Sequence, residues 1–129
     1  MVDVRVLIVD DHQPFRTALA ALVAVAPGLQ VVGLAGSGEE SMALAAELRP
    51  DLVLMDLHLP GIDGLTAARR IADLPQSPAV VLISTVPASE LPAAATADGP
   101  RRYLDKADLD LDRLEELRRW LNLDGTGNR

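Results

Sequence analysis

Acidic residues stand where two apolar segments of this 129-residue chain end. Residues 52–55 are all apolar and are followed by Asp56, and the apolar residues 6–9 are followed by Asp10 and Asp11. Apolar runs of this length are typical of buried parallel strands, whose carboxyl ends meet at one crevice of the sheet. We therefore expect the three carboxylates to lie close together.

Three converging carboxylates repel one another, and a divalent cation with oxygen ligands relieves the repulsion, so we expect Mg²⁺. A carboxylate in such a site can act as a nucleophile toward a phosphoryl group and form an acyl phosphate. The transfer also needs positive charge fixed around the moving group. Lys106 follows the short segment 103–105, and its ammonium group is the candidate for that charge.

Simpler roles stay open for each of these residues. Asp56 could cap the turn that follows its strand. Asp10 and Asp11 could cap the next helix, which has Pro14 in its first turn. A lysine such as Lys106 is usually a solvated surface residue.

Alternating strand and helix patterns predict how these residues are positioned. Apolar runs predict strands at residues 4–9, 30–34, 52–56, 79–83 and 103–105. Apolar residues at helical spacing predict helices at residues 15–26, 37–48, 65–72, 86–97 and 108–121. Right-handed crossovers then give an α/β domain with one parallel five-stranded sheet and helices on both faces. For a doubly wound sheet of five strands we expect the strand order 2-1-3-4-5.

Local signals mark several helix ends. Ser37 and Glu40 have the spacing of a capping box at the start of the second helix. Asp108 is the expected cap of the last helix. Pro87 and Pro92 fall within the fourth helical segment, where proline removes a backbone hydrogen bond, so we expect that helix to be short or displaced.

Length and composition bound the class of protein. The chain fits one domain, which we place at residues 1–122, followed by a disordered polar tail at 123–129. The absence of cysteine excludes disulfides and thiolate metal sites, and the net charge of −7 argues against direct binding of nucleic acid. Because no apolar run reaches the length of a membrane span and no signal peptide is evident, we expect a cytoplasmic protein with no membrane partner.

Four pieces of the chain together resemble a known family. They are VLIVDDHQPFR near the start, LVLMDLHLPGIDG in the middle, VVLIST before the fourth connection and YLDK near the end. In this order and spacing they are similar to the receiver domain of two-component response regulators, over residues 4 to about 121. VDDHQPFRTAL and GLQVVGLAGSGEES also resemble receivers of the subclass with LuxR/NarL-type helix-turn-helix outputs.

The chain departs from that family in two places. GPRRY stands where members commonly have a Gly-Ala-x-Gly-aromatic run, and KAD stands where many have a Lys-Pro. The second departure is frequent in the LuxR/NarL-type subclass. The first departure, with the proline-bearing fourth helix, bears on the signalling face and not on the acid cluster.

The resemblance implies a flavodoxin-like (βα)5 fold and a role for each site residue. Asp56 is the expected phosphoacceptor, and Lys106 is the expected partner of the phosphoryl group. Asp11 and Asp56 are the implied side-chain ligands of Mg²⁺. Asp10 is implied to act through water, and the backbone carbonyl of His58 completes the protein ligands.

Two more residues match the switch of that family. Ser84 matches the hydroxyl residue that turns toward the phosphoryl oxygens; Thr85 is the alternative, but Ser84 directly follows the fourth strand. Tyr103 matches the switch aromatic, which swings inward when the hydroxyl moves. Its alternative role is that of a rim aromatic packed on the last helix.

The remaining unusual side chains have less specific signals. His12 and His58 each stand near an acid, but a single imidazole in each cluster argues against a catalytic zinc site. We hypothesise that the His58 side chain, two residues past the acceptor, sets how fast water attacks the acyl phosphate. Trp120 lies at the edge of the last helix's apolar stripe, as core edge or as a partner contact.

The expected function is that of a bacterial signalling switch. We expect a sensor histidine kinase to phosphorylate Asp56. The domain then contacts a protein partner or a second copy of itself. It promotes its own phosphorylation and dephosphorylation but is not expected to be an enzyme. One alternative is the receiver piece of a DNA-binding transcriptional regulator; the polar, glycine-rich tail favours the stand-alone protein but could equally be a linker stub. The other alternative is a metal-dependent phosphatase or phosphotransferase. Such an enzyme would need a second general acid two residues past Asp56, where this chain has His58 instead.

Overall fold

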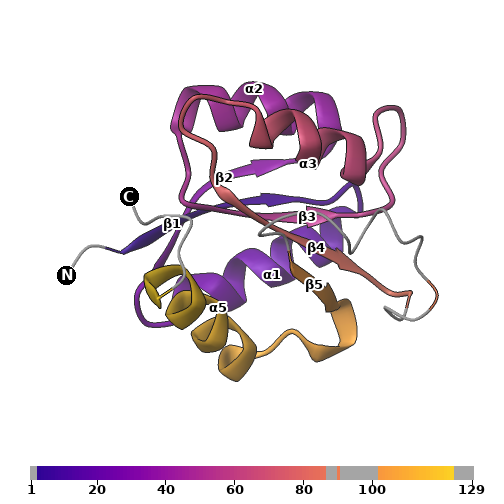
Figure 1. Cartoon of the computed structure of the whole chain (residues 1–129). Helices are drawn as coiled ribbons and strands as arrows, with labels where there is room; N and C mark the ends of the chain where they lie inside the picture. Colours follow the sequence, from indigo (N-terminus) through magenta and orange to yellow (C-terminus); the bar gives the residue numbers. More distant parts are fainter. Residues whose placement is uncertain (1–2, 87–89, 91–101, 124–129) are drawn as a thin grey trace.

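The computed structural model describes residues 3–86, 90 and 102–123 (Figure 1). The described strands form one parallel sheet in the order β2-β1-β3-β4-β5, as predicted. Their bounds are β1 Val4–Val9, β2 Leu29–Ala35, β3 Leu52–Asp56, β4 Ala79–Ser84 and β5 Arg102–Asp105. Each strand lies within one residue of its predicted bounds at either end.

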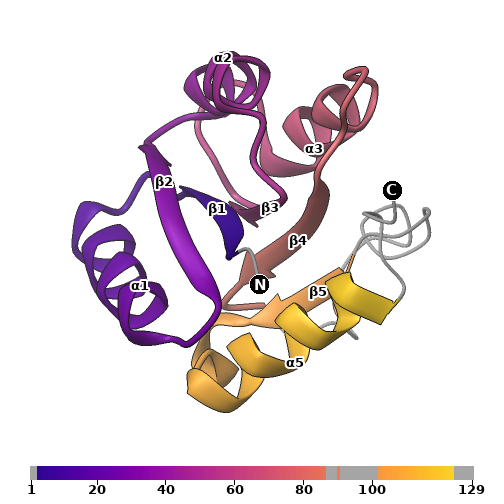
Figure 2. The ribbon, with the colours of Figure 1, turned by 90° about the vertical axis from the view of Figure 1, so that its left-hand side faces the viewer.

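Helices cover both faces of the sheet. They are α1 Gln13–Val25, α2 Gly38–Leu48, α3 Gly64–Ala72 and α5 Leu111–Leu123, with a 3₁₀ turn η2 at Lys106–Asp108. Figures 1 and 2 show α1 and α5 on one face and α2 and α3 on the other. The expected fourth helix at 86–97 and the expected tail at 123–129 fall almost wholly outside the described residues.

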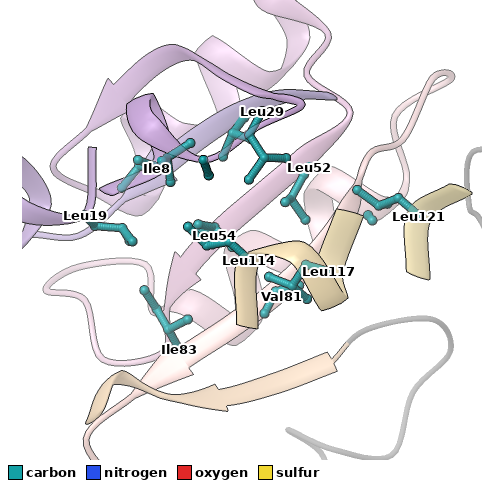
Figure 3. Packing of buried hydrophobic residues seen from close by; sticks show 14 residues of the cluster. Ile8, Leu19, Leu29, Leu52, Leu54, Val81, Ile83, Leu114, Leu117 and Leu121 are labelled. Carbon is teal, nitrogen blue, oxygen red and sulfur yellow. The ribbon is translucent and has the colours of Figure 1, made fainter. Parts of the chain in front are cut away.

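Alternation along the buried strands divides the core into two layers. On β1, Val6 and Ile8 contribute to the layer against α1 and α5, and Leu7 and Val9 contribute to the layer against α2 and α3. Figure 3 shows the first layer, which includes residues from the last helix. These are Leu114, Leu117 and Leu121, and each is buried.

The capping box at the start of α2 is present, with a small shift of partner. Ser37 Oγ accepts a hydrogen bond from Glu40 N at 3.0 Å, as predicted. Glu40 Oε1 accepts in return from Gly36 N at 2.8 Å, one residue before the expected donor. The two bonds fix the start of the helix.

The expected cap of the last helix was wrong by two residues. Asp108 lies inside η2, and Asp105 Oδ1 caps that turn by accepting from Ala107 N at 2.9 Å. The helix α5 begins only at Leu111, where Asp110 Oδ1 accepts from Arg113 N at 2.9 Å. A side-chain cap directly after β5 thus starts a 3₁₀ turn first and delays the helix.

The loop after β3 folds back tightly over the end of that strand. Gly64 N donates to Leu57 O at 3.0 Å, and a Cβ on Gly64 would overlap the Asp56 carbonyl oxygen and lie 2.8 Å from Leu57 Cα. Only glycine fits such a close approach. Asp63 then caps α3 by accepting from Thr66 N at 2.8 Å.

None of the helices in the described part of the chain is both long enough and apolar enough to span a bilayer.

Candidate functional site

The structure brings the three predicted acids together. One carboxylate oxygen from each of Asp10, Asp11 and Asp56 lies within 4.8 Å of the others. The acids meet because β1 and β3 are adjacent and in register, with Val9 beside Met55 at their carboxyl ends. Asp10 and Asp56 are buried, whereas Asp11 is exposed.

Backbone hydrogen bonds orient the two buried acids. Asp10 Oδ1 accepts from His12 N at 2.8 Å, and Asp56 Oδ1 accepts from His58 N at 3.1 Å. Asp56 therefore caps its turn with one oxygen while Oδ2 faces Lys106. Neither Asp10 nor Asp11 is the N-cap of α1, since His12 occupies that position and its side chain makes no capping bond. The helix-capping alternative is thus not what is found.

Lys106 closes the acid cluster from the end of β5. Its Nζ lies 2.7 Å from Asp10 Oδ2 and 3.6 Å from Asp56 Oδ2, and 15% of its side chain is exposed. Lys106 is the single lysine of the chain. The solvated-surface alternative is therefore wrong for this residue.

The donor set fits a divalent cation. Asp10 Oδ2 is buried, and among the described residues it has an ion pair with Lys106 Nζ but no hydrogen bond. Asp11 adds an exposed carboxylate at the rim. Mg²⁺ is usually bound through one or two carboxylates and keeps several waters, which suits a carboxylate cluster that is exposed on one side.

The surroundings disfavour a charge on Asp56 in the absence of a cation. Burial raises the pKa of Asp56, and the neighbouring charge of Asp10 raises it further. The His58 N–H and the Lys106 ammonium group act in the opposite direction without cancelling these effects. An additional positive charge at the cluster would stabilise the ionised carboxylate.

Ser84 and Thr85 have different surroundings at the end of β4. Ser84 is fully buried, and its Oγ accepts from Val86 N at 3.0 Å, whereas Thr85 is exposed. β4 neighbours β3, and Asp56 pairs with Ile83, the residue before Ser84. The burial and position of Ser84 favour it over Thr85 as the hydroxyl beside Asp56.

Tyr103 lies on the same face of the sheet as Ser84. Leu82 pairs with Tyr103 and Ser84 pairs with Asp105, so Ser84 and Tyr103 are diagonal neighbours. The Tyr103 hydroxyl donates to the carbonyl oxygen of Val86, and burial raises the pKa of the phenol. Tyr103 is half-buried and packs against the core layer of α2 and α3, so the expected alternative of packing on α5 is not found.

Two further side chains line the site and were not identified from the sequence. Lys106 Nζ lies 4.3 Å from the ring centroid of Phe15, and Arg16 donates to the carbonyl oxygen of Asp10 at 2.6 Å. Both belong to the first turn of α1, directly after the acid pair. That proximity in sequence was the available signal, but the apolar spacing of residues 15–26 predicted only a helix there.

The histidines and the tryptophan take less central positions. His12 and His58 are exposed, and neither belongs to the metal-ligand group found among the described residues. Trp120 is half-buried at the edge of the α1/α5 core layer, and the Arg102 guanidinium lies 5.3 Å from its ring centroid. Trp120 therefore lies at the edge of the core, which is one of its two expected roles.

A separate cavity of about 480 Å³ opens at the other end of the sheet, between the segments that precede β3 and β4. Its lining includes Arg49, Asp51 and three prolines. These residues form no convergent set of acids, so the chemistry points to the carboxyl ends of the strands.

Comparisons with known proteins agree with this geometry. The family model for the response regulator receiver domain matches residues 6–118. The response regulator GacA of Pseudomonas viridiflava is 43% identical over 103 residues, which cover 80% of this chain and 48% of that protein. The chain thus spans about half the length of this curated relative.

Solved structures show the same fold over nearly the whole chain. A two-component response regulator of the LuxR family from Aurantimonas sp. SI85-9A1 has a TM-score of 0.78 and 30% identity, covering 98% of this chain and 88% of that one. The signal receiver domain of a modulated diguanylate cyclase from Desulfovibrio desulfuricans G20 has a TM-score of 0.82 and 28% identity, covering 97% and 98%. By the family match, the sheet order and these likenesses, the chain belongs to the response regulator receiver domains of two-component systems.

Proposed function

We propose that this receiver domain is switched by phosphorylation of Asp56, with a sensor histidine kinase as donor and Mg²⁺ as cofactor. The observation that carries the proposal is the convergence of Asp10, Asp11 and Asp56 opposite Lys106. In the reaction, Asp56 Oδ2 forms a bond to phosphorus, and the bond from phosphorus to the donor nitrogen breaks. The histidine nitrogen leaves with the electron pair of that bond.

The residues of the site prepare Asp56 for this role. The His58 N–H holds Oδ1, so Oδ2 is directed into the crevice toward Lys106. The Lys106 ammonium group is then close enough to meet the negative charge that develops on the phosphoryl oxygens. Asp11, Asp56, Asp10 through water, and the His58 carbonyl would hold Mg²⁺, which when bound neutralises charge on the same oxygens.

Ser84, Val86 and Tyr103 connect the acceptor to the surface. The backbone N–H of Val86 is bonded to Ser84 Oγ, and its carbonyl accepts from the Tyr103 hydroxyl. A phosphoryl group on Asp56 adds about 1.5 to 2 negative charges and new acceptor oxygens. These would draw the Ser84 hydroxyl away from Val86 and so change the partner that holds Tyr103. Moving the switch from 1:99 to 99:1 takes about 5.5 kcal/mol of bias.

The domain as a whole would then act in the cytoplasm through protein contacts. It catalyses its own phosphorylation and dephosphorylation, and its activated surface binds a protein partner or a second copy of itself. The sequence relatives include longer proteins, so an output domain on the same polypeptide is a further candidate for that contact. A phosphatase acting on external substrates has less support, because the residue two past Asp56 is an exposed histidine rather than a carboxylic acid.

Mass spectrometry after incubation with acetyl phosphate and Mg²⁺ tests the proposal. We expect the protein to gain one phosphoryl group that hydroxylamine removes, and the Asp56→Asn variant to gain none. Asp73→Asn, an exposed change at the end of α3, is the matched control and should react like the wild type. A stable modification, or an equal gain in Asp56→Asn, would overturn the assignment.

A further inference from the structure

Phe15 and Lys106 meet across the end of the sheet. Phe15 lies in the first turn of α1, and Lys106 directly follows β5. The ammonium nitrogen lies 4.3 Å from the centre of the phenyl ring, within the range of a cation–π interaction. The two side chains are distant in the sequence and are brought together only by the fold.

The Lys106 ammonium group has two kinds of negative neighbour. The carboxylate oxygens Asp10 Oδ2 and Asp56 Oδ2 lie 2.7 Å and 3.6 Å from the ammonium nitrogen, and the ring presents the negative face of its quadrupole. Because only 15% of the lysine side chain is exposed, ring and carboxylates replace much of the water around the ammonium group. A lysine has a flexible stem and a strongly hydrated head, so an ordered position of this kind needs such neighbours.

Core packing alone does not require an aromatic ring at this position. Phe15 is half-buried and packs at the edge of the α1/α5 core layer, where a leucine would also make apolar contacts. A leucine would present no negative ring face to a cation. The chain has a single phenylalanine, and its ring lies against the single lysine.

We propose that Phe15 is a positioning residue for phosphoryl transfer, which acts by holding the Lys106 ammonium group between Asp10 and Asp56. The proposal rests on the proposed function of Asp56. A cation already in place does not have to move in from solvent when charge develops on the phosphoryl oxygens. Without the ring, the ammonium group gains water on that side and spends less time in the crevice.

A double-mutant cycle tests whether Phe15 acts through Lys106. Phe15→Leu and Phe15→Tyr are each made alone and together with Lys106→Met, and urea unfolding verifies that every variant is folded. The measurement is the rate of acyl-phosphate formation at saturating Mg²⁺ over a range of acetyl phosphate concentrations. We expect Phe15→Leu to lower the limiting rate roughly three- to thirtyfold. Phe15→Tyr, which keeps the ring face, should stay within about twofold of the wild type.

The same cycle separates positioning from a purely structural effect. When Lys106→Met is already present, Phe15→Leu should slow the reaction no further, because the interaction it removes is gone. An equal slowing in both backgrounds would overturn the proposal, as would a wild-type rate in folded Phe15→Leu. A Phe15→Tyr variant as slow as Phe15→Leu would overturn it as well.

A second measurement examines the contact without phosphorylation. Because Lys106 is the single lysine, labelling with ¹³C-lysine gives one set of ε-methylene signals by NMR. A ring at this distance should shift those protons upfield, and the shift should disappear in Phe15→Leu and persist in Phe15→Tyr. An unshifted signal in the wild type would overturn the contact itself. A wild-type protein that shows the shift but gains no phosphoryl group would instead refute the proposed function, and the positioning role with it.

Discussion

Burial and a neighbouring acid both disfavour the charge of the Asp56 carboxyl group. Its pKa is raised first by burial and then by the charge of Asp10. A carboxyl group whose pKa is higher in the folded state than in the unfolded chain binds its proton more tightly when folded. Its ionisation therefore lowers the stability of the fold as the pH rises from its unfolded toward its folded pKa. The position of Asp56 in the acid cluster therefore lowers the stability of the fold at neutral pH.

The first prediction concerns this loss of stability on ionisation of Asp56. With a chelator present, Asp56→Asn should raise the melting temperature at neutral pH, because the variant removes a buried charge that the fold disfavours. The gain should shrink as the pH falls and Asp56 takes up its proton in the wild type. Differential scanning calorimetry across a pH series measures both effects. A variant that is less stable than the wild type at neutral pH would contradict the direction of the pKa shift.

At the scale of elements, the strands were more predictable than the helix ends. The buried strands β3 and β4 face helices on both sides, so they appear in the sequence as continuous apolar runs with clear limits. The start of α5 depended on which of several nearby aspartates made the cap. Asp105 caps the 3₁₀ turn η2, and Asp110 caps α5. Composition alone does not distinguish these two aspartates from Asp108.

The same contrast holds for the candidate site. Asp10, Asp11, Asp56 and Lys106 were predictable because each follows a strand, and strand order decides which strand ends are neighbours. The place of Phe15 in the site was not predictable, because its distance from Lys106 depends on how the first turn of α1 packs over the strand ends. Side chains carried by strand ends are fixed by topology, whereas side chains carried by helices also depend on packing.

The second prediction concerns the cap of α3, the helix that follows the loop after β3. Asp63 accepts from Thr66 N, and this hydrogen bond lowers the pKa of the exposed Asp63 carboxyl. A lowered pKa gives stability that is present above the unfolded value and is lost as the pH falls through the folded value. We expect Asp63→Ala to reduce the free energy of unfolding by about 1 kcal/mol at neutral pH.

Urea unfolding at a series of pH values measures this effect. The difference between the wild type and Asp63→Ala should narrow toward acid pH, where the wild-type carboxyl loses its charge. Asp63→Asn keeps an oxygen acceptor without a titrating group, so it is the matched control and its stability relative to Asp63→Ala should change little with pH. A wild-type advantage that is constant with pH would show that the carboxylate charge is not what stabilises the helix.

At the scale of the whole molecule, the acid cluster exists only while the sheet is intact. Asp10 and Asp11 follow β1, Asp56 ends β3, and Lys106 follows β5. In Figure 1 these strand ends lie on the opposite side of the molecule from the start of β1 and the end of α5. The unfolded chain has no means of holding the acids within 4.8 Å of one another. Binding of a cation at this cluster would therefore be linked to folding.

The third prediction is the size and specificity of that linkage. Mg²⁺ at ten times its dissociation constant should raise the free energy of unfolding by about 1.4 kcal/mol, because it binds the native state and not the unfolded chain. Asp11→Asn should remove most of this increment, and since Asp11 is exposed the variant should fold normally without Mg²⁺. Asp73→Asn carries the same change of charge at an exposed position at the end of α3 and should keep the full increment. Urea unfolding with and without Mg²⁺ measures all three proteins, and an equal increment in the two variants would place the cation somewhere other than the acid cluster.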